Sequence, residues 1–284
     1  VGEHLPPRTE RLFFTTRADP IGIGGNRGSI LNVIQDFVDS FYASNNGRPL
    51  DVAQQGLVSL KNRWETAGVT LAIDAVGTTG YGEELFARAF HADYHTVETV
   101  AHARAACACV PDATFVLDIG GQDMKALWIK NGMVANAILN EACSSGCGSF
   151  IEGTAHSLHL SPYAFNDAAL TSEHPVDLGT KCTVFMSSRV KHAQKIGASV
   201  NDLAAGIAYS VVKNALFRII GAERIDSLGP KIVVQGGAFK SDAVLRAFEK
   251  ICKVEVIRPD SAHLMGAIGA ALIARERAHD AMGK

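Results

Sequence analysis

The segment that most limits how this chain can fold is an apolar run that ends in an acidic residue and a pair of glycines. Residues 114–117 are typical of a buried strand, and residues 118–123 then read Asp-Ile-Gly-Gly-Gln-Asp. Glycine has no side chain, so the backbone N–H groups of Gly120 and Gly121 can come close to an anion. The sequence therefore predicts a strand and a tight turn that is able to receive a phosphate group.

The acidic residues of this turn need a reason to lie beside a phosphate, because like charges repel. A cation between them removes the repulsion, so Asp118, together with Asp123, indicates Mg²⁺ held directly or through water. Gln122 or Asp123 would then orient an attacking water, which is the main side-chain task in phosphoryl transfer. An ordinary glycine turn with solvent-facing acidic residues is the alternative interpretation.

A second glycine pair favours the phosphate interpretation. Residues 231–234 are typical of a strand, and Gly236 and Gly237 follow it before a predicted helical segment. A turn of this kind can pack flat against an adenine ring or a ribose. The helix predicted at residues 262–278 carries many small residues, which allow its backbone to lie close to another element, as at a hinge between two lobes.

Strands and helices alternate along the chain from residue 69 onward. The strongest local signal is Asn131-Gly132, a dipeptide that favours a hairpin turn between two strands. One antiparallel hairpin within an alternating chain indicates an α/β protein with a mixed sheet. The predicted strands are residues 11–16, 69–76, 114–117, 124–130, 133–140, 231–234 and 254–257, and the predicted helices are residues 49–64, 83–90, 98–109, 149–160, 182–196, 201–220, 241–252 and 262–278.

Composition and charge exclude several other classes of protein. The 284-residue chain has a net charge of -2, which gives no basic field for nucleic acid or for an anionic membrane. Its longest apolar run, residues 266–274, is far shorter than the ~20 residues of a membrane span. Residues 1–7 lack the basic start and apolar core of a signal peptide, and no initiator Met is present. The protein is therefore expected to be cytoplasmic, and the chain to be an excerpt, processed or trimmed.

Two of the six cysteines occupy positions that favour metal or redox chemistry. Cys143 precedes a predicted helix and Cys182 lies near the start of another, and a helix N-terminus favours a thiolate. Two ligands are too few for a closed metal site, but a twofold dimer that shares one centre would supply four. An intrachain site with Cys143 and Cys147, spaced i and i+4, and incidental buried thiols are the alternatives. Small buried hydrophobic residues are expected at Cys107, Cys109 and Cys252.

In this order, the features resemble the actin-like ATPase fold of sugar kinases, Hsp70 and actin. The turn at Asp118 is similar to the second phosphate loop, Gly236-Gly237 to the adenosine loop, and residues 265–271 to the second connecting helix. The resemblance implies an α/β, actin-like (ribonuclease H-like) ATPase fold, with two lobes, mixed sheets and a nucleotide cleft. The first lobe is expected at residues 1–112 and the second at residues 113–260, with residues 261–284 packing back towards the first lobe as a helix.

Four motifs carry a closer resemblance. Residues 77–82 read Gly-Thr-Thr-Gly-Tyr-Gly, residues 118–125 read Asp-Ile-Gly-Gly-Gln-Asp-Met-Lys, residues 143–150 read Cys-Ser-Ser-Gly-Cys-Gly-Ser-Phe, and residues 182–185 read Cys-Thr-Val-Phe. Together they resemble the activators of 2-hydroxyacyl-CoA dehydratases and the ATPase subunits of benzoyl-CoA reductase. The similarity extends over about residues 40–280.

The resemblance implies that Cys143 and Cys182 bind one 4Fe–4S cluster between two identical subunits. ATP hydrolysis in that family changes the angle between the cluster-bearing helices, and a low-potential electron passes to a CoA-ester dehydratase or reductase. An upstream donor such as ferredoxin or flavodoxin would supply the electron. Since one hairpin separates Asp123 from Cys143, phosphate contacts are expected to reach the cluster ligand through that hairpin. By the same resemblance, phosphate, Mg²⁺ and water are handled by Asp118, Gly120, Gly121, Gln122, Asp123 and Lys125, and the nucleoside by Gly236, Gly237 and Ala238.

Two features depart from that family. Its first phosphate loop, Asp-x-Gly-Ser/Thr, has no counterpart here, and residues 26–29 (Asn-Arg-Gly-Ser) are the nearest candidate. Cys147 stands where the family often has Thr or Asn. The missing first phosphate loop bears on nucleotide binding and ATP hydrolysis, and it leaves two alternatives to the activator. One is a small-molecule kinase of the same fold, for which no carboxylate base stands out, and the other is a non-catalytic nucleotide-binding or dimerisation module of a longer activator.

Overall fold

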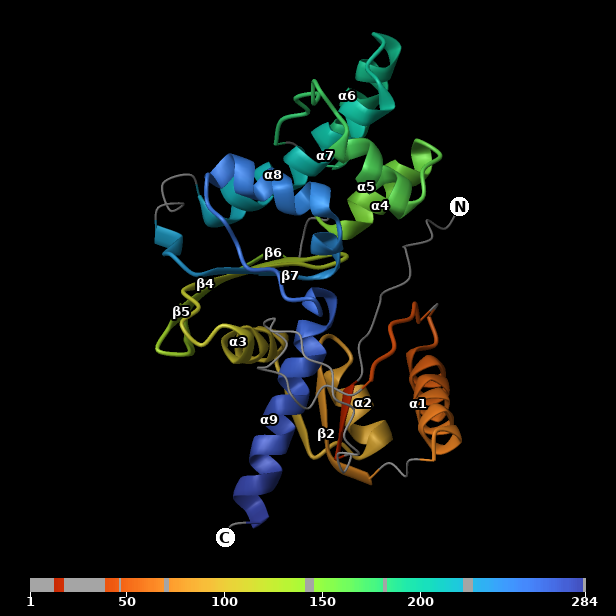
Figure 1. The fold of residues 1–284 in the computed structure, drawn as a ribbon, viewed down its shortest axis with the longest axis vertical. Helices are drawn as coiled ribbons and strands as arrows, with labels where there is room; N and C mark the ends of the chain where they lie inside the picture. Colours follow the sequence, from red (N-terminus) through yellow and green to blue (C-terminus); the bar gives the residue numbers. More distant parts are fainter. Residues whose placement is uncertain are drawn as a thin grey trace. The chain divides into compact units, whose positions relative to one another are not determined.

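The chain divides into two compact units, each with its own sheet (Figure 1). One unit consists of Val1–Pro111 with Leu264–Lys284, and the other of Asp112–His263. The computed structural model describes residues 13–17, 39–45, 47–68, 72–140, 146–180, 183–221 and 227–282.

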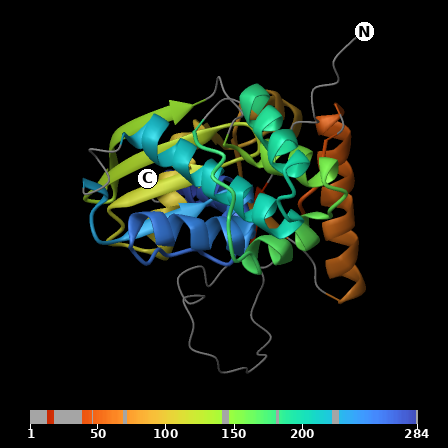
Figure 2. The same cartoon turned by 90° about the horizontal axis from the view of Figure 1, so that it is seen from above.

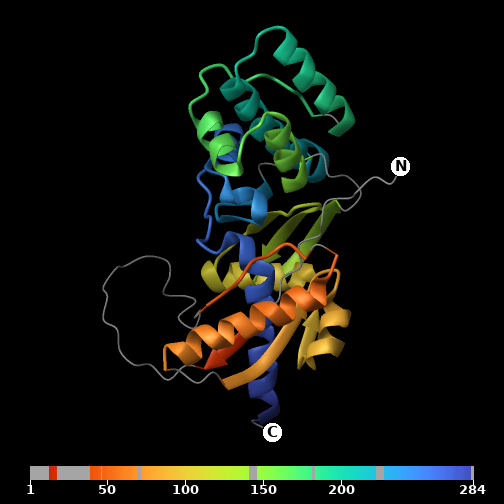
Figure 3. The same cartoon turned by 90° about the vertical axis from the view of Figure 1, so that its right-hand side faces the viewer.

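The sheet of the first unit has three strands in the order β1-β2-β3. β2 pairs antiparallel with β1 and parallel with β3. Helices α3 and α9 pack on each other, and α9 also packs along β2 (Figure 3). The elements of this unit are β1 Phe13–Arg17, α1 Pro49–Thr66, β2 Ala72–Thr79, α2 Glu83–Phe90, β3 Tyr94–Thr96, α3 Glu98–Cys109 and α9 Met265–Met282.

The small residues of α9 allow the close approach that the sequence predicts. A Cβ atom at Gly269 would lie 1.8 Å from the carbonyl oxygen of Ala101 in α3. On the strand side, a Cβ atom at Gly77 in β2 would lie 2.3 Å from the carbonyl oxygen of Ala270. Only glycine fits at these two positions, because any larger residue would force the backbones apart.

The sheet of the second unit has four strands in the order β6-β5-β4-β7. β4 (Phe115–Ile119) runs parallel to β7 (Ile232–Gln235) and antiparallel to β5 (Met124–Lys130), which in turn pairs antiparallel with β6 (Met133–Asn140). Asn131 and Gly132 both have positive φ angles, 53° and 73°. This is the geometry that a two-residue hairpin turn of the favoured type requires, so the predicted hairpin is confirmed.

Helices cover one face of this sheet, and α7 is the central one (Figure 2). Each of the other four α-helices in the described part of this unit packs against α7, so the buried residues of α7 lie all round rather than on one stripe. Leu203, Ile207 and Val211 of α7 join Phe115 and Leu117 of β4 in one hydrophobic core. The five helices are α4 Gly148–Ser157, α5 Pro162–Leu170, α6 Thr183–Lys195, α7 Val200–Asn214 and α8 Asp242–Cys252.

Two predictions about this unit are wrong in detail, and one helix was missed. The helix predicted over residues 201–220 changes at Ala215 into a π-helix, Ala215–Ile220, because hydrophobic spacing does not distinguish the two helical forms. Residues 254–257 do not form a strand: only Ile257 bonds to β7, through an isolated bridge to Val233. Helix α5 was not predicted, although it begins with a Ser161 cap followed by a proline.

The N-terminus of α8 is capped by a residue of another helix. Ser241 precedes the helix but makes no capping bond with its side chain. Asn166 of α5 supplies the cap instead, since its Oδ1 accepts from Ala243 N at 3.1 Å and from Ser241 Oγ at 3.0 Å. In the described ranges, no helix is long and apolar enough to cross a bilayer.

Candidate functional site

Asp118 lies on β4, one of the two strands of the second unit's sheet that have partners on both sides. It is opposite Lys125 on β5 and beside Gln235 on β7. All three side chains are buried, and Asp118 is only 1% exposed. A carboxylate in such a place needs a compensating charge or a cation, because burying an ion without one is costly.

Two of the other predicted residues lie beside Asp118. The ammonium of Lys125 pairs with Asp123 Oδ2, and both side chains are buried. A Cβ atom at Gly120 would lie 2.6 Å from Asp123 Oδ1 and 3.9 Å from Asp118 Oδ2, so both carboxylates face this glycine. The structure thus brings together two carboxylates and one ammonium, whose formal charges sum to -1. A divalent cation would find negative charge and oxygen ligands here.

The turn after β4 presents its backbone to solvent. Gly120 donates its N–H to the carbonyl oxygen of Asp123 at 3.0 Å, which closes the turn. Gly121 is exposed, and no heavy atom lies within 4 Å of the place where its Cβ would be. Gln122 is partly exposed beside it. An open glycine backbone of this kind lets an anion approach N–H groups closely.

No group of three or more metal-ligating side chains gathers among the residues that the structure describes. Magnesium does not require such a group, because it is usually held by one or two carboxylates, several waters and the phosphates of a substrate. Asp118 and Asp123 therefore fit a magnesium–nucleotide better than a metal bound by the protein alone.

The second glycine turn packs directly on the end of β4. Gly236 has a φ of 95°, and a Cβ atom there would lie 2.3 Å from the carbonyl oxygen of Ile119. Its N–H donates to the carbonyl oxygen of Ala262 at 2.7 Å. Gly237 begins a short 3₁₀-helix, Gly237–Lys240, in which Ala238 is buried. The structure therefore brings the two predicted glycine turns together, while the Ala238 side chain faces the core.

Gln235 is a candidate that the sequence prediction missed. Gln235 is fully buried, and it is in register with Asp118 on the neighbouring parallel strand. Its position in the sequence was an available signal: it is a polar residue at the end of an apolar strand, directly before a glycine pair, and Asp118 lies one residue further from its own glycine pair. Its carboxamide belongs to the same buried polar group as the predicted site.

Helix α4 begins on the turn after β4. Gly148 N donates to Gly120 O at 2.9 Å, and Ser149 N donates to Gly121 O at 2.8 Å. The first N–H groups of a helix have no acceptors within the helix, and here the glycine turn supplies them. The approach is close, since a Cβ atom at Gly148 would lie 3.3 Å from Gly120 O.

Cys143 and Cys182 lie outside the described residues, as do residues 26–29, the candidate for the first phosphate loop. The chain on either side of the cysteines is described. Three residues after Cys143, Gly146 lies against α7, where its Cβ would be 3.1 Å from Asn214 Cβ. Three residues before Cys182, Gly179 O accepts from Ser210 Oγ at 2.6 Å. Ser210 and Asn214 are one helical turn apart, so Gly146 and Gly179 contact neighbouring turns of α7.

Several further contacts fix the segment that leads to Cys182. Lys213 Nζ donates to Asp177 Oδ1 at 2.8 Å, and this hydrogen bond lowers the pKa of the Asp177 carboxyl. Arg189 of α6 donates to Leu178 O at 3.2 Å, and a Cβ atom at Gly206 would lie 2.3 Å from Val176 O. Helix α6 begins at Thr183, directly after Cys182, so this cysteine precedes a helix as predicted.

The other cysteines differ in their surroundings. Cys147 is fully buried in the core and directly precedes α4. Cys109 is buried, whereas Cys107 and Cys252 are partly exposed. Burial raises the pKa of the thiols of Cys107, Cys109 and Cys252, and it raises that of Cys252 to about 11. A neutral thiol is a poor metal ligand, so none of these three resembles a cluster ligand.

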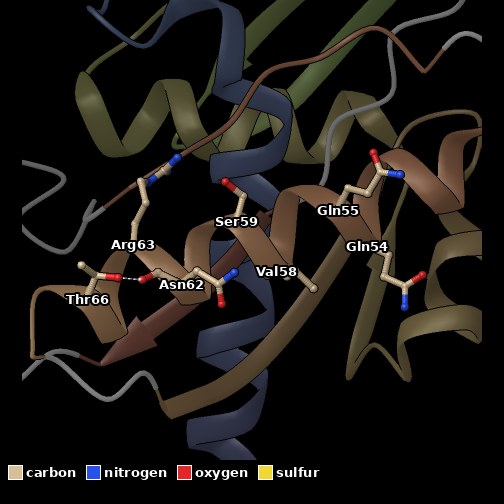
Figure 4. A pocket seen from close by; sticks show the side chains of 7 residues that line it. All are labelled: Gln54, Gln55, Val58, Ser59, Asn62, Arg63 and Thr66. Carbon is tan, nitrogen blue, oxygen red and sulfur yellow. Dashed lines mark hydrogen bonds between the residues drawn. The ribbon is translucent and has the colours of Figure 1, made fainter.

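A separate hollow of about 780 Å³ lies along α1 in the first unit (Figure 4). None of the predicted site residues lines it. Its one charged group, Arg63, is engaged, since its Nη2 lies 2.7 Å from Asp39 Oδ2, which also accepts from Trp64 Nε1 at 3.1 Å. The lining consists of Gln54, Gln55, Val58, Ser59, Asn62, Arg63 and Thr66.

Comparison with known proteins decides the family. Residues 26–274 match the BadF/BadG/BcrA/BcrD ATPase family. The chain belongs to this family. A 2-hydroxyisocaproyl-CoA dehydratase activator from Clostridioides difficile is 32% identical over 211 residues, which are 73% of this chain and 76% of the relative.

Two solved structures extend the comparison within the BadF/BadG/BcrA/BcrD ATPase family. The activator of the 2-hydroxyisocaproyl-CoA dehydratase from Clostridium difficile with bound ADPNP superposes with a TM-score of 0.73 at 28% identity, covering 87% of this chain and 88% of that one. Component A of the Acidaminococcus fermentans (R)-2-hydroxyglutaryl-CoA dehydratase gives 0.67 at 31% identity, covering 73% and 78%. The predicted mixed α/β, actin-like ATPase fold is confirmed.

Proposed function

We propose that this chain is an ATP-dependent iron–sulfur activator. Two copies share one 4Fe–4S cluster, and ATP hydrolysis drives a low-potential electron to a CoA-ester dehydratase or an aryl-CoA reductase. Membership of an ATPase family supports the nucleotide chemistry, and the relative named as a dehydratase activator supports this class of partner. A cytoplasmic ferredoxin or flavodoxin is the proposed upstream donor.

Cys143 and Cys182 are the proposed cluster ligands. They give two thiolates per chain, and a twofold dimer gives the four that such a cluster needs. The observation that carries this proposal is the anchoring of Gly146 and Gly179, the flanks of the two cysteines, on consecutive turns of α7. A shared rigid support favours two cysteines that act on one group. When bound, the cluster supplies a one-electron redox centre.

The nucleotide is proposed to bind at the turn after β4. Asp118 and Asp123 hold Mg²⁺ through oxygen or water, and the open backbone of Gly121, beside Gly120, receives a phosphate. Lys125 keeps Asp123 in place through its ion pair, and Gln122 orients the attacking water. In the second turn, Gly236, Gly237 and Ala238 contact the nucleoside through their backbone.

The bonds from α4 to the phosphate turn supply the proposed coupling. When hydrolysis changes the contacts at Gly120 and Gly121, the N-terminal turn of α4 must move, or the N–H groups of Gly148 and Ser149 lose their acceptors. The segment that contains Cys143 leads into this helix. A movement of α4 would therefore change the position of one proposed cluster ligand, Cys143, in each chain.

Anaerobic reconstitution with iron and sulfide tests the proposal. We expect about four iron and four sulfide per dimer, with loss of most of both in Cys143→Ser and Cys182→Ser. Cys252→Ser is the matched control, because the raised pKa of this thiol makes it a poor ligand, and it should keep the full cluster. A full cluster in the Cys143→Ser, Cys182→Ser double variant would show that these residues are not the ligands.

ATP turnover separates the activator from its rivals. We expect hydrolysis that depends on Mg²⁺ and is lost in Asp118→Asn, while Asp112→Asn, an exposed residue before the same strand, keeps it. Turnover in iron-free protein that rises with a sugar or a carboxylic acid would instead identify a small-molecule kinase. Calorimetry without any ATP binding would identify a non-catalytic module.

A further inference from the structure

Gln235 is a buried polar residue to which the proposed function gives no role. It ends β7, whose other residues are apolar, and it is fully buried. Burial of a carboxamide is unfavourable unless the group is hydrogen-bonded, so an apolar residue would be more stable at this position without a polar neighbour. The carboxamide of Gln235 therefore calls for a polar group that makes use of it.

The side chain of Gln235 lies on the same face of the sheet as that of Asp118. Successive residues of a strand point to opposite faces. On β4, Leu117 and Ile119 belong to the helix-covered core, and on β7 Val234 does. Asp118 and Gln235 alternate with these core residues, so both side chains point to the opposite face.

Lys125 completes a row of three polar side chains on this face. It is opposite Asp118 on β5, as Gln235 is on β7, so the three residues lie side by side at the strand spacing of about 4.8 Å. All three are buried, between 0% and 2% exposed. The ammonium of Lys125 pairs with Asp123. On the other side of Asp118, the neighbour is a neutral carboxamide.

The backbone holds Gln235 in this register from both edges of β7. On one edge, Ile257 makes two backbone hydrogen bonds to β7, at 2.8 and 2.9 Å. On the edge next to β4, a Cβ atom at Gly236 would lie 2.3 Å from Ile119 O. The end of β7 therefore has no room to shift towards β4, and the fold fixes the place of Gln235 beside Asp118.

We propose that Gln235 is a positioning residue of the magnesium site, whose Nε2–H donates a hydrogen bond to the carboxylate of Asp118. This role rests on the proposed function and adds a determinant of metal affinity to it. The bond fixes the rotation of the carboxylate, as hydrogen bonds to metal-binding carboxylates do. A neutral donor suits this task, because a second ammonium in the row would cancel the formal charge of -1 that attracts Mg²⁺.

The test measures the binding of a non-hydrolysable ATP analogue to the full chain by calorimetry, once with Mg²⁺ and once with EDTA. The ratio of the two affinities reports the part of binding that depends on the metal. Gln235→Met keeps the length of the side chain and removes the amide. We expect it to lower this ratio at least about tenfold, which is typical for the loss of a residue that orients a metal ligand, and to leave the affinity in EDTA unchanged.

Val233→Ala is the matched control. Val233 is buried on the same face of β7, but it is in register with Val116. Its truncation should leave a cavity and lower the stability to urea, while the affinity ratio stays parental. If Gln235→Met does not fold, Gln235→Asn withdraws the amide from Asp118 by one methylene group and should lower the ratio as well.

Urea unfolding without Mg²⁺ tests whether Gln235 acts through Asp118. Gln235→Met should destabilise the parent, because a buried carboxylate then loses its donor, and should not destabilise Asp118→Leu, in which that carboxylate is absent. Additive effects of the two changes would overturn the role of Gln235.

Two results of the calorimetry would also overturn this role. One is a parental affinity ratio in folded Gln235→Met or Gln235→Asn, and the other is an equal loss of affinity with Mg²⁺ and with EDTA. A parent protein whose affinity for the analogue does not depend on Mg²⁺ would instead overturn the proposed magnesium site, so the two failures are distinguishable.

Discussion

Ser149 donates its backbone N–H to the carbonyl oxygen of Gly121 across 2.8 Å, and the bond from Gly148 to Gly120 lies directly beside it. The sequence suggests that the phosphate turn reaches Cys143 through the hairpin formed by residues 124–140. The structure offers a shorter route. Two peptide hydrogen bonds join the turn to the helix that follows the cysteine segment, so the hairpin is not needed for the connection.

The change Gly148→Val should weaken this connection. Its side chain would meet Gly120 O and Gly121 Cα, which lie 3.3 and 3.5 Å from a Cβ atom, and overpacking of this kind costs about 1–3 kcal/mol. We expect Mg-ATP to change the rate at which a chelator removes cluster iron from the parent dimer, and to change it less in the variant.

Gly153→Ala is the control on the same helix. No atom lies within 4 Å of a Cβ atom there, and alanine in a helix interior stabilises by about 0.5–1 kcal/mol relative to glycine. This variant should be more stable to urea and should respond to Mg-ATP as the parent does. An equal response in Gly148→Val would argue against the α4 route.

The buried ion pair of Lys125 and Asp123 leads to a second prediction. Lys125→Met removes the ammonium and leaves two buried carboxylates facing Gly120, and breaking a buried pair typically costs about 3–5 kcal/mol. Mg²⁺ should recover part of this loss by supplying the missing positive charge. The measurement is urea unfolding of the variant with and without Mg²⁺.

Lys130→Met is the control for that experiment, because Lys130 lies on the same strand but is exposed. Its effect on the free energy of unfolding should stay within about 0.5 kcal/mol, with no added dependence on Mg²⁺. If Mg²⁺ stabilises both variants equally, the cation does not bind near Asp118 and Asp123.

Much of the fold could be predicted because local signals and tertiary packing agree. Asn131-Gly132 predicts the hairpin that the structure shows, and the helix predicted at residues 98–109 has the observed bounds of α3. The strand predicted at residues 254–257 fails because β-propensity does not reveal whether a pairing partner is available. Only Ile257 finds one, on β7.

The site was predictable as a set of residue types but not as an arrangement. The turn suggested Asp118 and Asp123, and the family resemblance added Lys125, yet the arrangement of these three side chains depends on the pairing of β4 with β5. Gln235 was missed because it stands in no motif. Burial and register single it out, and these are properties of the folded chain.

The two glycine turns should respond differently to alanine. Gly236→Ala forces a Cβ atom to within 2.3 Å of Ile119 O at a φ of 95°, so we expect a loss on the order of 3 kcal/mol in the free energy of unfolding. Gly121→Ala meets open space and should fold normally, but its methyl group covers the backbone that receives phosphate.

Calorimetry with a non-hydrolysable ATP analogue and Mg²⁺ distinguishes these effects. Gly121→Ala should bind the analogue at least about tenfold more weakly than the parent, with stability within about 0.5 kcal/mol. Parental affinity in Gly121→Ala would place the phosphate elsewhere.

Thiol reactivity gives a prediction that needs neither iron nor ATP. Burial raises the pKa of Cys252 to about 11, so at pH 8 only about one molecule in 1,000 carries the thiolate there. Cys182 directly precedes α6, and a helix N-terminus lowers a thiol pKa. With iodoacetamide on the anaerobic apo protein, Cys182 should react at least about tenfold faster than Cys252 at pH 8.

The labelling rate of Cys252 should also depend on pH, and the raised pKa gives the direction of that dependence. A raised pKa means that the folded state holds the proton, so the labelling rate of Cys252 should climb roughly tenfold per pH unit until the pH nears 11. In urea the two rates should converge, because the helix and the burial are both lost. Equal rates for the two thiols in the folded protein would mean that α6 does not activate Cys182, and would remove one support for it as a cluster ligand.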